Sequence, residues 1–461
     1  MNYSNPKFQR IYFSAPYPLK ILFSSIYGLK QRNERYGNHF NYYLDLLKNS
    51  EYKDNQTLLR ELEFEKEKFI EFALNNSSYY KNVYKGIKNF KEFQILTKND
   101  LRNHKNSIIV ESLLSSSRMV HTSGTTGSAL VFPITKECFQ REYAFRAMHY
   151  YWAGIDVLKK PRIATFSGHP VADPTRNKAP FWVYDFVNNW LLFSSYHINE
   201  ESEREYIKKI IEFDPIAFHG YPSTIYLIAL AHKKYGRKLR SLKAIFTASE
   251  TLYDFQRNMI EDVFQTKVYN WYGNTEMCAN IVECDKGRMH LKLEHSYVEI
   301  LDENNQPVKP GERGRLVCTA IGNKAFPLIR YDIGDIAQLS KVEKCECGRG
   351  GLIIDFVEGR KEDYIITKDG KKIGRLDHLF KDTLGIKEAQ IVQTEVGRII
   401  IKIVPADSFS DKDLNLLKNE IYVRFGNKID YEIEKVNHIS RGANGKFRFV
   451  VSEIKNNIII N

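Results

Sequence analysis

The stretch LKAIFTASE, residues 242–250, is a short apolar run that ends in small and polar residues, and KVYNWYG follows it at 267–273. Two similar runs lie upstream, PRIATFSG at 161–168 and PIAFHGYPS at 215–223. Short apolar runs that alternate with helical patterns are typical of parallel strands joined by helices. The segment from about 105 to 275 is therefore predicted to form a parallel α/β sheet.

The flanking segments have different patterns. Residues 1–95 carry apolar side chains at helical spacing, as in NYYLDLLKNS and TLLRELEFEKEKFIEFALNNS, with no Gly or Pro inside these runs. From 296 to 356 strands alternate with polar turns, and SYVEILDENNQPVKPGERGRLVCT predicts two strands joined by a turn. After Gly359 a small segment of strands and one helix begins.

We therefore expect an α/β protein in which a large N-terminal domain precedes a small α+β domain. The helical part covers 1–95, the large domain 96–360 with a β-rich subdomain from about 296, and the small domain 361–461. A chain of 461 residues is too long for one compact core, so this division agrees with its length.

The charge balance favours anionic partners. Lys and Arg number 68 against 56 Asp and Glu, a net charge of +12. Nucleotides, nucleic acid and anionic lipid headgroups are the classes that such a balance attracts. No tract of five or six like charges and no basic stripe with stacking aromatics is present, so a nucleic-acid-binding role is not expected.

The cysteines and the N-terminal segment predict a cytoplasmic protein. Six cysteines show no disulfide-framework spacing, so we expect reduced thiols. YPLKILFSSIYGLK at 17–30 is too short, and interrupted by Lys20, for a secretory signal or a membrane span. It is either a helix docked on the protein itself or a basic, aromatic amphipathic helix at a membrane surface.

The hexapeptide TSGTTG at 122–127 is unlike its surroundings. Its glycines and small hydroxyls can place several short donors around a phosphate, which makes it either an anion-binding loop or an ordinary surface loop. It is not a Walker A loop, because no Gly-Lys-Ser/Thr follows, and the chain has no GxGxxG fingerprint at a strand-to-helix junction.

Three further short motifs follow in order: YGNTE at 272–276, YDIGD at 331–335 and GRKED at 359–363. The first ends a predicted strand, where α/β sheets place ligands, and its glutamate could hold a hydrated Mg²⁺ that bridges phosphates. Each motif alone could be a turn. Four such motifs in this order, TSGTTG included, indicate a nucleotide site.

The order and content of these motifs resemble the adenylate-forming superfamily of acyl- and aryl-CoA ligases, luciferases and peptide-synthetase adenylation domains. GKF at 445–447 resembles the segment that carries the family's catalytic lysine, and the likeness extends over nearly the whole chain. LIRYDIGD followed by CECGR resembles the phenylacetate–CoA ligase branch. ERYGNHF, NNSSYYKNVY and TKNDLR in the helical start look most like its capsular-polysaccharide-biosynthesis members.

The resemblance implies a role for each matching residue. The residues expected to enclose the ATP phosphates are Thr122, Ser123, Gly124, Thr125, Thr126 and Gly127. Those expected along the adenine are Ala248, Ser249, Glu250, Tyr272 and Gly273, with the ring of Tyr272 stacked on the base. Thr275 would contact the α-phosphate and Glu276 would ligate Mg²⁺. Asp335 and Arg360 would hold the ribose, Glu362 would be the hinge of a mobile small domain, and Lys446 would contact the carboxylate and the α-phosphate. A lysine where negative charge gathers lowers a barrier by several kcal/mol.

Two positions depart from the family pattern. Many relatives have a lysine a few residues after the phosphate loop, where this chain has Ser128, Ala129 and Leu130. The usual Thr of the YxTGD motif is Ile333. Neither change removes a residue that must react, so activity is still expected.

Cys284, His290, Cys345 and Cys347 form a possible zinc set. Three thiolates and an imidazole complete a tetrahedral Zn²⁺ shell, and a closed shell of this kind is structural. Fifty-five residues separate the two halves, so the alternative is four unlinked side chains. A comparable metal site in some members of the phenylacetate–CoA ligase branch favours the zinc interpretation.

The resemblance implies a two-step ligase that uses ATP and Mg²⁺. A carboxylate attacks the α-phosphate and releases pyrophosphate, and an acceptor then displaces AMP. The acceptor is either CoA or an amine on a sugar or amino acid, the latter in surface-polysaccharide biosynthesis. His219, Tyr221, Trp271 and His169 are expected near the acid, which is either aromatic or polar. A relative that binds nucleotide without turnover would have lost Glu276, Asp335 or Lys446, and all three are present.

Overall fold

The computed structural model describes most of the chain. The described residues are 11–121, 130–168, 171–173, 176, 178–358, 365–370, 372–373, 376–380, 385–442, 447–452 and 454. The predictions for 122–127, His169, Arg360, Glu362 and Lys446 lie outside these residues.

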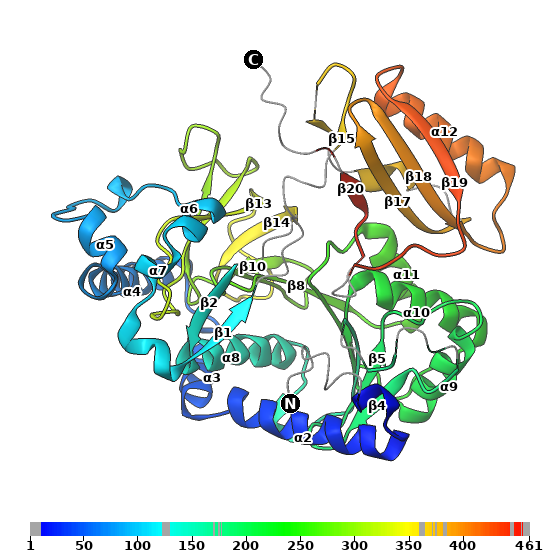
Figure 1. The fold of residues 1–461 in the computed structure, drawn as a ribbon, viewed down its shortest axis with the longest axis horizontal. Helices are drawn as coiled ribbons and strands as arrows, with labels where there is room; N and C mark the ends of the chain where they lie inside the picture. Colours follow the sequence, from blue (N-terminus) through cyan, green and yellow to red (C-terminus); the bar gives the residue numbers. More distant parts are fainter. Residues whose placement is uncertain are drawn as a thin grey trace.

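Helices dominate the N-terminal part of the chain (Figure 1). They are α2 (Tyr17–Arg35), α3 (Asn38–Ser50), α4 (Asn55–Asn76), α5 (Ser78–Val83), η1 (Phe90–Glu92), α6 (Lys98–Asn103), α7 (Lys105–Ile108) and η2 (Glu111–Ser116). At the start of α4 the Asp54 carboxylate accepts from the Thr57 backbone N–H at 2.9 Å, which caps the helix. None of the helices within the described residues is long and apolar enough to cross a bilayer.

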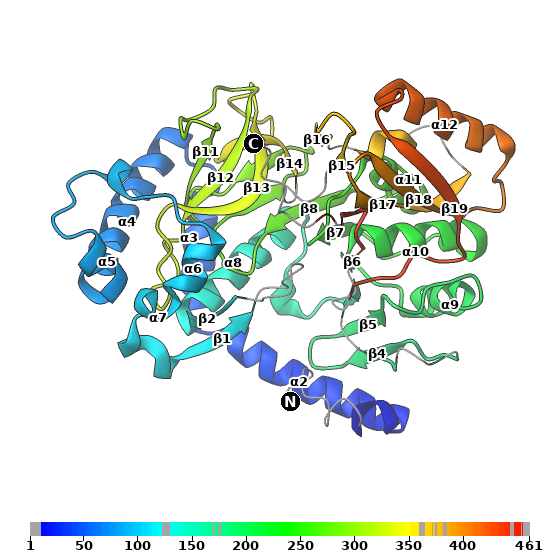
Figure 2. The ribbon, with the colours of Figure 1, turned by 45° about the horizontal axis from the view of Figure 1, so that its top comes forward.

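A twelve-stranded sheet runs through the large part of the molecule in the order β11-β12-β13-β14-β10-β9-β8-β7-β6-β3-β5-β4 (Figure 2). Its strands are β3 (Ile163–Ser167), β4 (Trp182–Asp185), β5 (Trp190–Ser194), β6 (Ala217–Gly220), β7 (Ala244–Ala248), β8 (Val268–Gly273), β9 (Asn280–Glu283), β10 (Met289–Leu291), β11 (Tyr297–Leu301), β12 (Arg313–Thr319), β13 (Tyr331–Leu339) and β14 (Leu352–Glu358). The neighbours β5, β3, β6, β7 and β8 pair in parallel, as predicted. Antiparallel strands continue the sheet on both sides, so the predicted α/β class is confirmed as a mixed sheet.

Helices cover both faces of the parallel strands. They are α8 (Lys136–Trp152), η3 (Val157–Lys159), α9 (Glu203–Phe213), α10 (Pro222–Tyr235) and α11 (Asp254–Phe264). Residues on β7 alternate between the faces: Ala244 and Phe246 join a core with α8, whereas Ile245 joins the core of α9, α10 and α11. This alternation follows from the two-residue period of a strand and gives a three-layer arrangement.

The β-rich half begins at β9 and belongs to the same sheet. The predicted hairpin in 296–319 is present, since Tyr297 pairs with Thr319 across β11 and β12. A separate pair, β1 (Ser117–His121) and β2 (Val131–Thr135), flanks the segment 122–130.

A smaller C-terminal unit has its own sheet and core (Figure 1). It contains β15 (Ile365–Ile366), β16 (Lys372–Ile373), η4 (Leu376–Phe380), β17 (Ile386–Glu395), β18 (Arg398–Pro405), α12 (Asp411–Phe425), β19 (Asp430–Lys435) and β20 (Val450–Ser452). Four strands form a sheet in the order β19-β18-β17-β20, and α12 packs its Leu417, Ile421 and Phe425 into the core. This unit contacts the α9–α11 side of the large part, where Lys234 of α10 lies 3.2 Å from Asp407.

Candidate functional site

Two of the predicted motifs, YGNTE and YDIGD, meet at the end of β8. The Tyr272 hydroxyl donates a hydrogen bond to the Asp335 carboxylate of β13 at 2.5 Å, and both side chains are half-buried. Burial and the neighbouring carboxylate raise the pKa of Tyr272 well above its usual value, so the phenol stays protonated and can donate. The residues expected on adenine and ribose are therefore in contact.

The turn after β8 presents Glu276. The Asn274 side chain accepts from the Cys278 backbone N–H at 3.0 Å and closes this turn, with Met277 in the left-handed region at φ 52°. Glu276 is only 6% exposed, and one of its oxygens accepts from the Tyr331 hydroxyl at 3.2 Å. Its carboxylate is thus held in place with acceptor capacity to spare, while Thr275 beside it is half-buried.

The neighbouring strand β7 ends in Ala248, with Ser249 and Glu250 directly beyond it. Ala248 lies opposite Trp271 in the register of β7 and β8, and Ser249 has a left-handed φ of 74°. The Glu250 carboxylate accepts from the Ser223 N–H at 3.2 Å and from the Phe447 N–H at 2.5 Å. Burial raises the pKa of Glu250 although these donors oppose the shift. The predicted adenine stretch therefore also joins the large part to the C-terminal segment.

Two of the residues expected near the acid, His219 and Trp271, lie on the α8 face of the sheet. His219 on β6 contacts the Tyr150 hydroxyl through Nδ1 at 2.6 Å, and the two rings are nearly parallel. Trp271 is 7% exposed, and its buried Nε1 has no hydrogen-bond partner among the described residues. Tyr221 is half-buried just beyond the end of β6, and burial raises its pKa to about 12.

Sequence reasoning missed two residues of α8 in this cluster. The Arg146 guanidinium lies 4.4 Å from the Trp271 ring centre and 3.5 Å from Glu142. Tyr150, one turn further along α8, holds His219. One feature of the sequence could have indicated them. The segment KECFQREYAFRAMHYYW contains many charged and polar residues, and the structure buries this helix on several sides.

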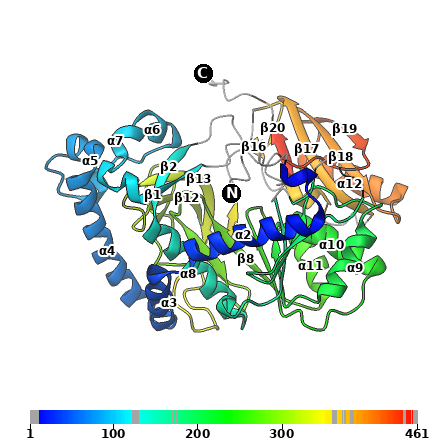
Figure 3. The ribbon, with the colours of Figure 1, turned by 60° about the horizontal axis from the view of Figure 1, so that its bottom comes forward.

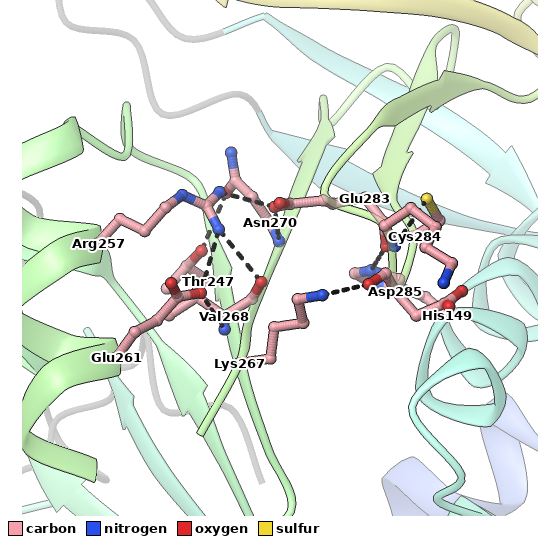
Figure 4. Close-up of polar contacts among 11 residues, drawn as sticks. His149, Thr247, Arg257, Glu261, Lys267, Val268, Asn270, Glu283, Cys284 and Asp285 are labelled. Carbon is pink, nitrogen blue, oxygen red and sulfur yellow. Dashed lines mark hydrogen bonds and ion pairs between the residues drawn. The ribbon is translucent and has the colours of Figure 1, made fainter. Parts of the chain in front are cut away.

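A buried polar network beneath the site fixes strands β7, β8 and β9 (Figure 4). Glu283 is 3% exposed and accepts from Arg257 Nη2 and from the Asn270 N–H, each at 2.8 Å. Burial raises the pKa of Glu283 even though Arg257 opposes it. His149 Nε2 donates to the Glu283 carbonyl at 3.1 Å, and burial lowers the pKa of His149 to about 4, so the ring is neutral. A fixed Glu283 positions the adjoining Cys284.

The predicted zinc residues come together. Cys284, His290, Cys345 and Cys347 place their ligating atoms within 4.8 Å of one another. The sulfurs of Cys284 and Cys345 are 3.6 Å apart, and Cys347 Sγ is 3.4 Å from His290 Nε2. The other ring nitrogen of His290 contacts the Gly350 carbonyl at 3.1 Å, which leaves Nε2 directed at the cluster.

The donor chemistry of this cluster fits a tetrahedral metal. Three of its residues are buried and Cys347 is partly exposed. Backbone N–H groups of Lys286 and Arg349 point at two of the sulfurs, an arrangement that stabilises thiolates. Arg349 also forms ion pairs with Glu51 at 2.7 Å and Asp285 at 2.6 Å, which hold the Cys345–Cys347 loop against the β9–β10 turn.

Comparison with known proteins gives both family and fold relatives. The CapK C-terminal domain family matches residues 365–453. Protein CapK of Staphylococcus aureus is 27% identical over an alignment 463 residues long. The alignment covers 96% of this chain and 99% of that protein. Phenylacetate-coenzyme A ligase of Thermus thermophilus is 29% identical over 174 residues, or 36% of this chain and 39% of that protein.

Among solved structures, 2-hydroxyisobutyryl-CoA ligase in the postadenylation state, in complex with R3-HIB-AMP, aligns with a TM-score of 0.66 at 18% identity, covering 88% of this chain and 91% of that chain. The same ligase in the thioesterification state aligns with a TM-score of 0.52 at 18% identity, covering 87% and 91%. The chain therefore has the fold of the adenylate-forming ligases, and the resemblance to that superfamily is confirmed. The chain is also similar to protein CapK over nearly its whole length.

Proposed function

We propose that this protein is an ATP-dependent, AMP-forming ligase that activates a carboxylic acid as an acyl-adenylate. The observation that carries the proposal is the meeting of the YGNTE and YDIGD motifs, in which Tyr272 bonds Asp335 and Tyr331 bonds Glu276. The members of these pairs are 63 and 55 positions apart in the sequence, and their meeting at the carboxyl end of a parallel strand supports one site rather than two independent turns.

Each group in this site has a role in binding ATP. Asp335 holds the ribose hydroxyls and Tyr272 packs on the adenine, with Ala248 and Ser249 along the base. Thr275 contacts the α-phosphate. Glu276 fits Mg²⁺, because its buried carboxylate is oriented by Tyr331 and keeps free acceptor sites. Bound Mg²⁺ would neutralise charge on the phosphates.

The chemistry requires no nucleophilic side chain from the protein. An oxygen of the substrate carboxylate attacks the α-phosphorus, the bond to the bridging oxygen breaks, and pyrophosphate leaves with that electron pair. Positioning and charge neutralisation lower the barrier. The loop 122–127 would hold the departing phosphates, and Lys446 would stabilise the charge shared by the carboxylate and the α-phosphate.

The arrangement of the two units supports an adenylation-type conformation. Glu250 binds the Phe447 N–H, next to the segment that contains Lys446. The higher TM-score to the postadenylation state, 0.66 against 0.52, agrees with this arrangement. Release of this contact would let the small unit rotate about Glu362 so that an acceptor can enter.

For the acid we propose a polar carboxylate. Three features lie on the same side of the sheet: Arg146, the Tyr150–His219 pair, and Trp271 Nε1, which has no hydrogen-bond partner in the described part of the chain. Groups of this kind recognise hydroxyl or charged substituents, whereas an aromatic acid would leave Nε1 buried without a partner. His169 and Tyr221 are proposed to complete the acid site.

For the acceptor we propose an amine on a sugar or amino acid, in surface-polysaccharide biosynthesis within the cytoplasm. The support is the full-length likeness to protein CapK. CoA is the second candidate, because 2-hydroxyisobutyryl-CoA ligase, which shares the fold, was solved with CoA, and a CoA ligase matches part of the chain. We also propose that Cys284, His290, Cys345 and Cys347 bind a structural Zn²⁺.

ATP–pyrophosphate exchange over a panel of carboxylic acids tests the proposal. Exchange with one acid is expected for the wild type and is expected to be lost in Lys446→Ala, whereas Lys418→Ala, at an exposed position of α12, keeps it. Product analysis with CoA or an amino sugar then distinguishes the acceptors. Mg·ATP binding without exchange for any acid would instead favour a nucleotide-binding protein that does no such chemistry.

A further inference from the structure

Helix α2 turns an apolar face to the solvent. Leu19, Leu22, Ile26 and Leu29 are 45%, 44%, 46% and 49% exposed. They follow one another at intervals of three, four and three residues, which places them on one stripe of the helix. A surface helix ordinarily directs such a stripe at the core. In α2 the apolar stripe instead faces the solvent.

The opposite face of α2 holds the helix on the protein through polar and small residues. Its buried positions are Lys20, Ser24, Ser25 and Gly28. Ser25 Oγ accepts from the Phe186 N–H at 3.2 Å. At Gly28 the absence of a side chain lets the Asp185 carboxylate of β4 approach closely. Helix α2 is therefore docked on the protein itself, as one of the two alternatives predicted. This contact with the protein uses none of the four aliphatic side chains of the stripe.

Loops beside α2 extend the apolar surface. Phe186, whose N–H bonds Ser25, is 55% exposed, and Leu158, whose carbonyl accepts from Arg32 at 3.1 Å, is 38% exposed. Ile11, just before the helix, is 60% exposed. These exposed side chains add apolar area to the surface around α2.

The charges around this surface are mainly positive. Lys30, Lys159 and Lys160 are exposed, and Lys159 and Lys160 directly follow Leu158. The acidic residues nearby are Asp156, Glu34 and Glu212. Glu34 is paired with Lys30 at 3.8 Å and Arg118 at 3.1 Å, and Glu212, which is near Tyr17, is paired with Lys209 at 3.1 Å. Basic side chains that flank an apolar stripe match the headgroup and acyl layers of an anionic membrane.

We propose that the outward face of α2 docks the protein on an anionic lipid bilayer, with Leu19, Leu22, Ile26 and Leu29 among the acyl chains. Helix α2 lies along the lower edge of the molecule in Figure 2 and across its front in Figure 3. A helix of 19 residues is about 28 Å long, so a flat surface can contact all of it at once. Docking through α2 does not depend on the proposed ligase chemistry.

Vesicle sedimentation of the full chain tests this inference. Phosphatidylcholine vesicles are compared with vesicles that also contain phosphatidylglycerol. The double variant Leu22→Ser with Ile26→Ser removes two stripe residues. The matched control is Leu59→Ser with Phe64→Ser on α4, where the side chains are 41% and 57% exposed on another part of the surface. A charge variant, Lys30→Gln with Lys159→Gln, tests the basic flank.

Binding to the anionic vesicles is expected for the wild type and the α4 control. The stripe variant should bind about tenfold to hundredfold more weakly, because each buried methylene contributes to membrane partitioning. The charge variant should lose the preference for phosphatidylglycerol. Equal binding of the stripe variant and wild type, or no binding of either, would overturn the proposal. A wild-type dimer that the stripe variant dissociates would also overturn it and assign the face to a second copy. Unchanged thermal denaturation of the variants confirms that they are folded.

Discussion

Cys347→Ser is the substitution that most directly tests the proposed metal centre. Cys347 is the one member of the cluster that is partly exposed, so its replacement by Ser costs little packing by itself. The other three ligands stay in place, and His290 keeps its contact with the Gly350 carbonyl. Any large loss of stability in this variant therefore comes from loss of the metal rather than from a damaged core.

The size of the effect follows from binding linkage. A metal present at a thousandfold excess over its dissociation constant stabilises the folded state by about 4 kcal/mol. The Arg349 ion pairs with Glu51 and Asp285 are only partly exposed and remain in the variant, so the Cys345 loop keeps part of its support. We expect the variant to stay folded, with a melting temperature lower by about 4–5 °C.

Metal analysis and thermal denaturation together measure the outcome. The wild type is expected to hold one Zn²⁺ per chain and to lose stability with a strong chelator, whereas Cys347→Ser should hold little zinc and respond weakly to the chelator. The matched control is Cys138→Ser, since Cys138 is buried beside Met277 at 3.7 Å and lies outside the cluster. That control should lose some stability and keep its zinc. A wild type without zinc after expression in zinc-containing medium, or a Cys347→Ser variant with full zinc, would refute the reasoning.

Three further predictions concern the site and α2. Glu250→Ala removes a charge-assisted hydrogen bond between the two units, so pyrophosphate exchange should fall about tenfold while transfer from a preformed adenylate falls less; an equal loss in both steps would exclude a conformational role. Tyr331→Phe frees Glu276 from its hydrogen bond, so half-maximal exchange should require severalfold more Mg²⁺ in a magnesium titration; an unchanged titration would show that the hydroxyl does not orient the carboxylate. Gly28→Val places a side chain against Asp185, and such overpacking costs about 1–3 kcal/mol. Hydrogen exchange should then rise in α2 alone, and unchanged protection there would refute the close packing.

The α/β units were predictable because their signals are local. A strand such as KVYNWYG carries its own apolar run and terminating glycine, and α4 carries its own cap and stripe. The hairpin of β11 and β12 has a polar turn between two runs, so it was predicted as well. The edge pair β4 and β5 was not predicted, since its residues are stabilised by their partners in the sheet rather than by a pattern of their own.

The candidate site was predictable only as a set of motifs. YGNTE and YDIGD identify Glu276 and Asp335, but nothing local indicates that Tyr331 bonds Glu276. Arg146 and Tyr150 were missed for a related reason. Helix α8 buries charged residues on several sides, so its pattern has no polar face from which the site-facing positions could be recognised.

The shape of the sheet explains how the distant motifs meet. In the strand order, β8 and β13 are separated by β9, β10 and β14, which is four steps. Four steps in a flat sheet would span about 19 Å, because neighbouring strands lie about 4.8 Å apart. The hydrogen bond between Tyr272 and Asp335 is nevertheless 2.5 Å long, so the sheet must curve strongly between these strands. The pairing of β13 with β14 has a register shift between Gln338 and Leu339, and its pairing with β12 has one between Arg315 and Val317. Irregularities of this kind increase the local twist of a sheet. The ATP site proposed here is thus a product of sheet curvature, and a substitution that regularises β13 should separate Tyr272 from Asp335 without changing either residue.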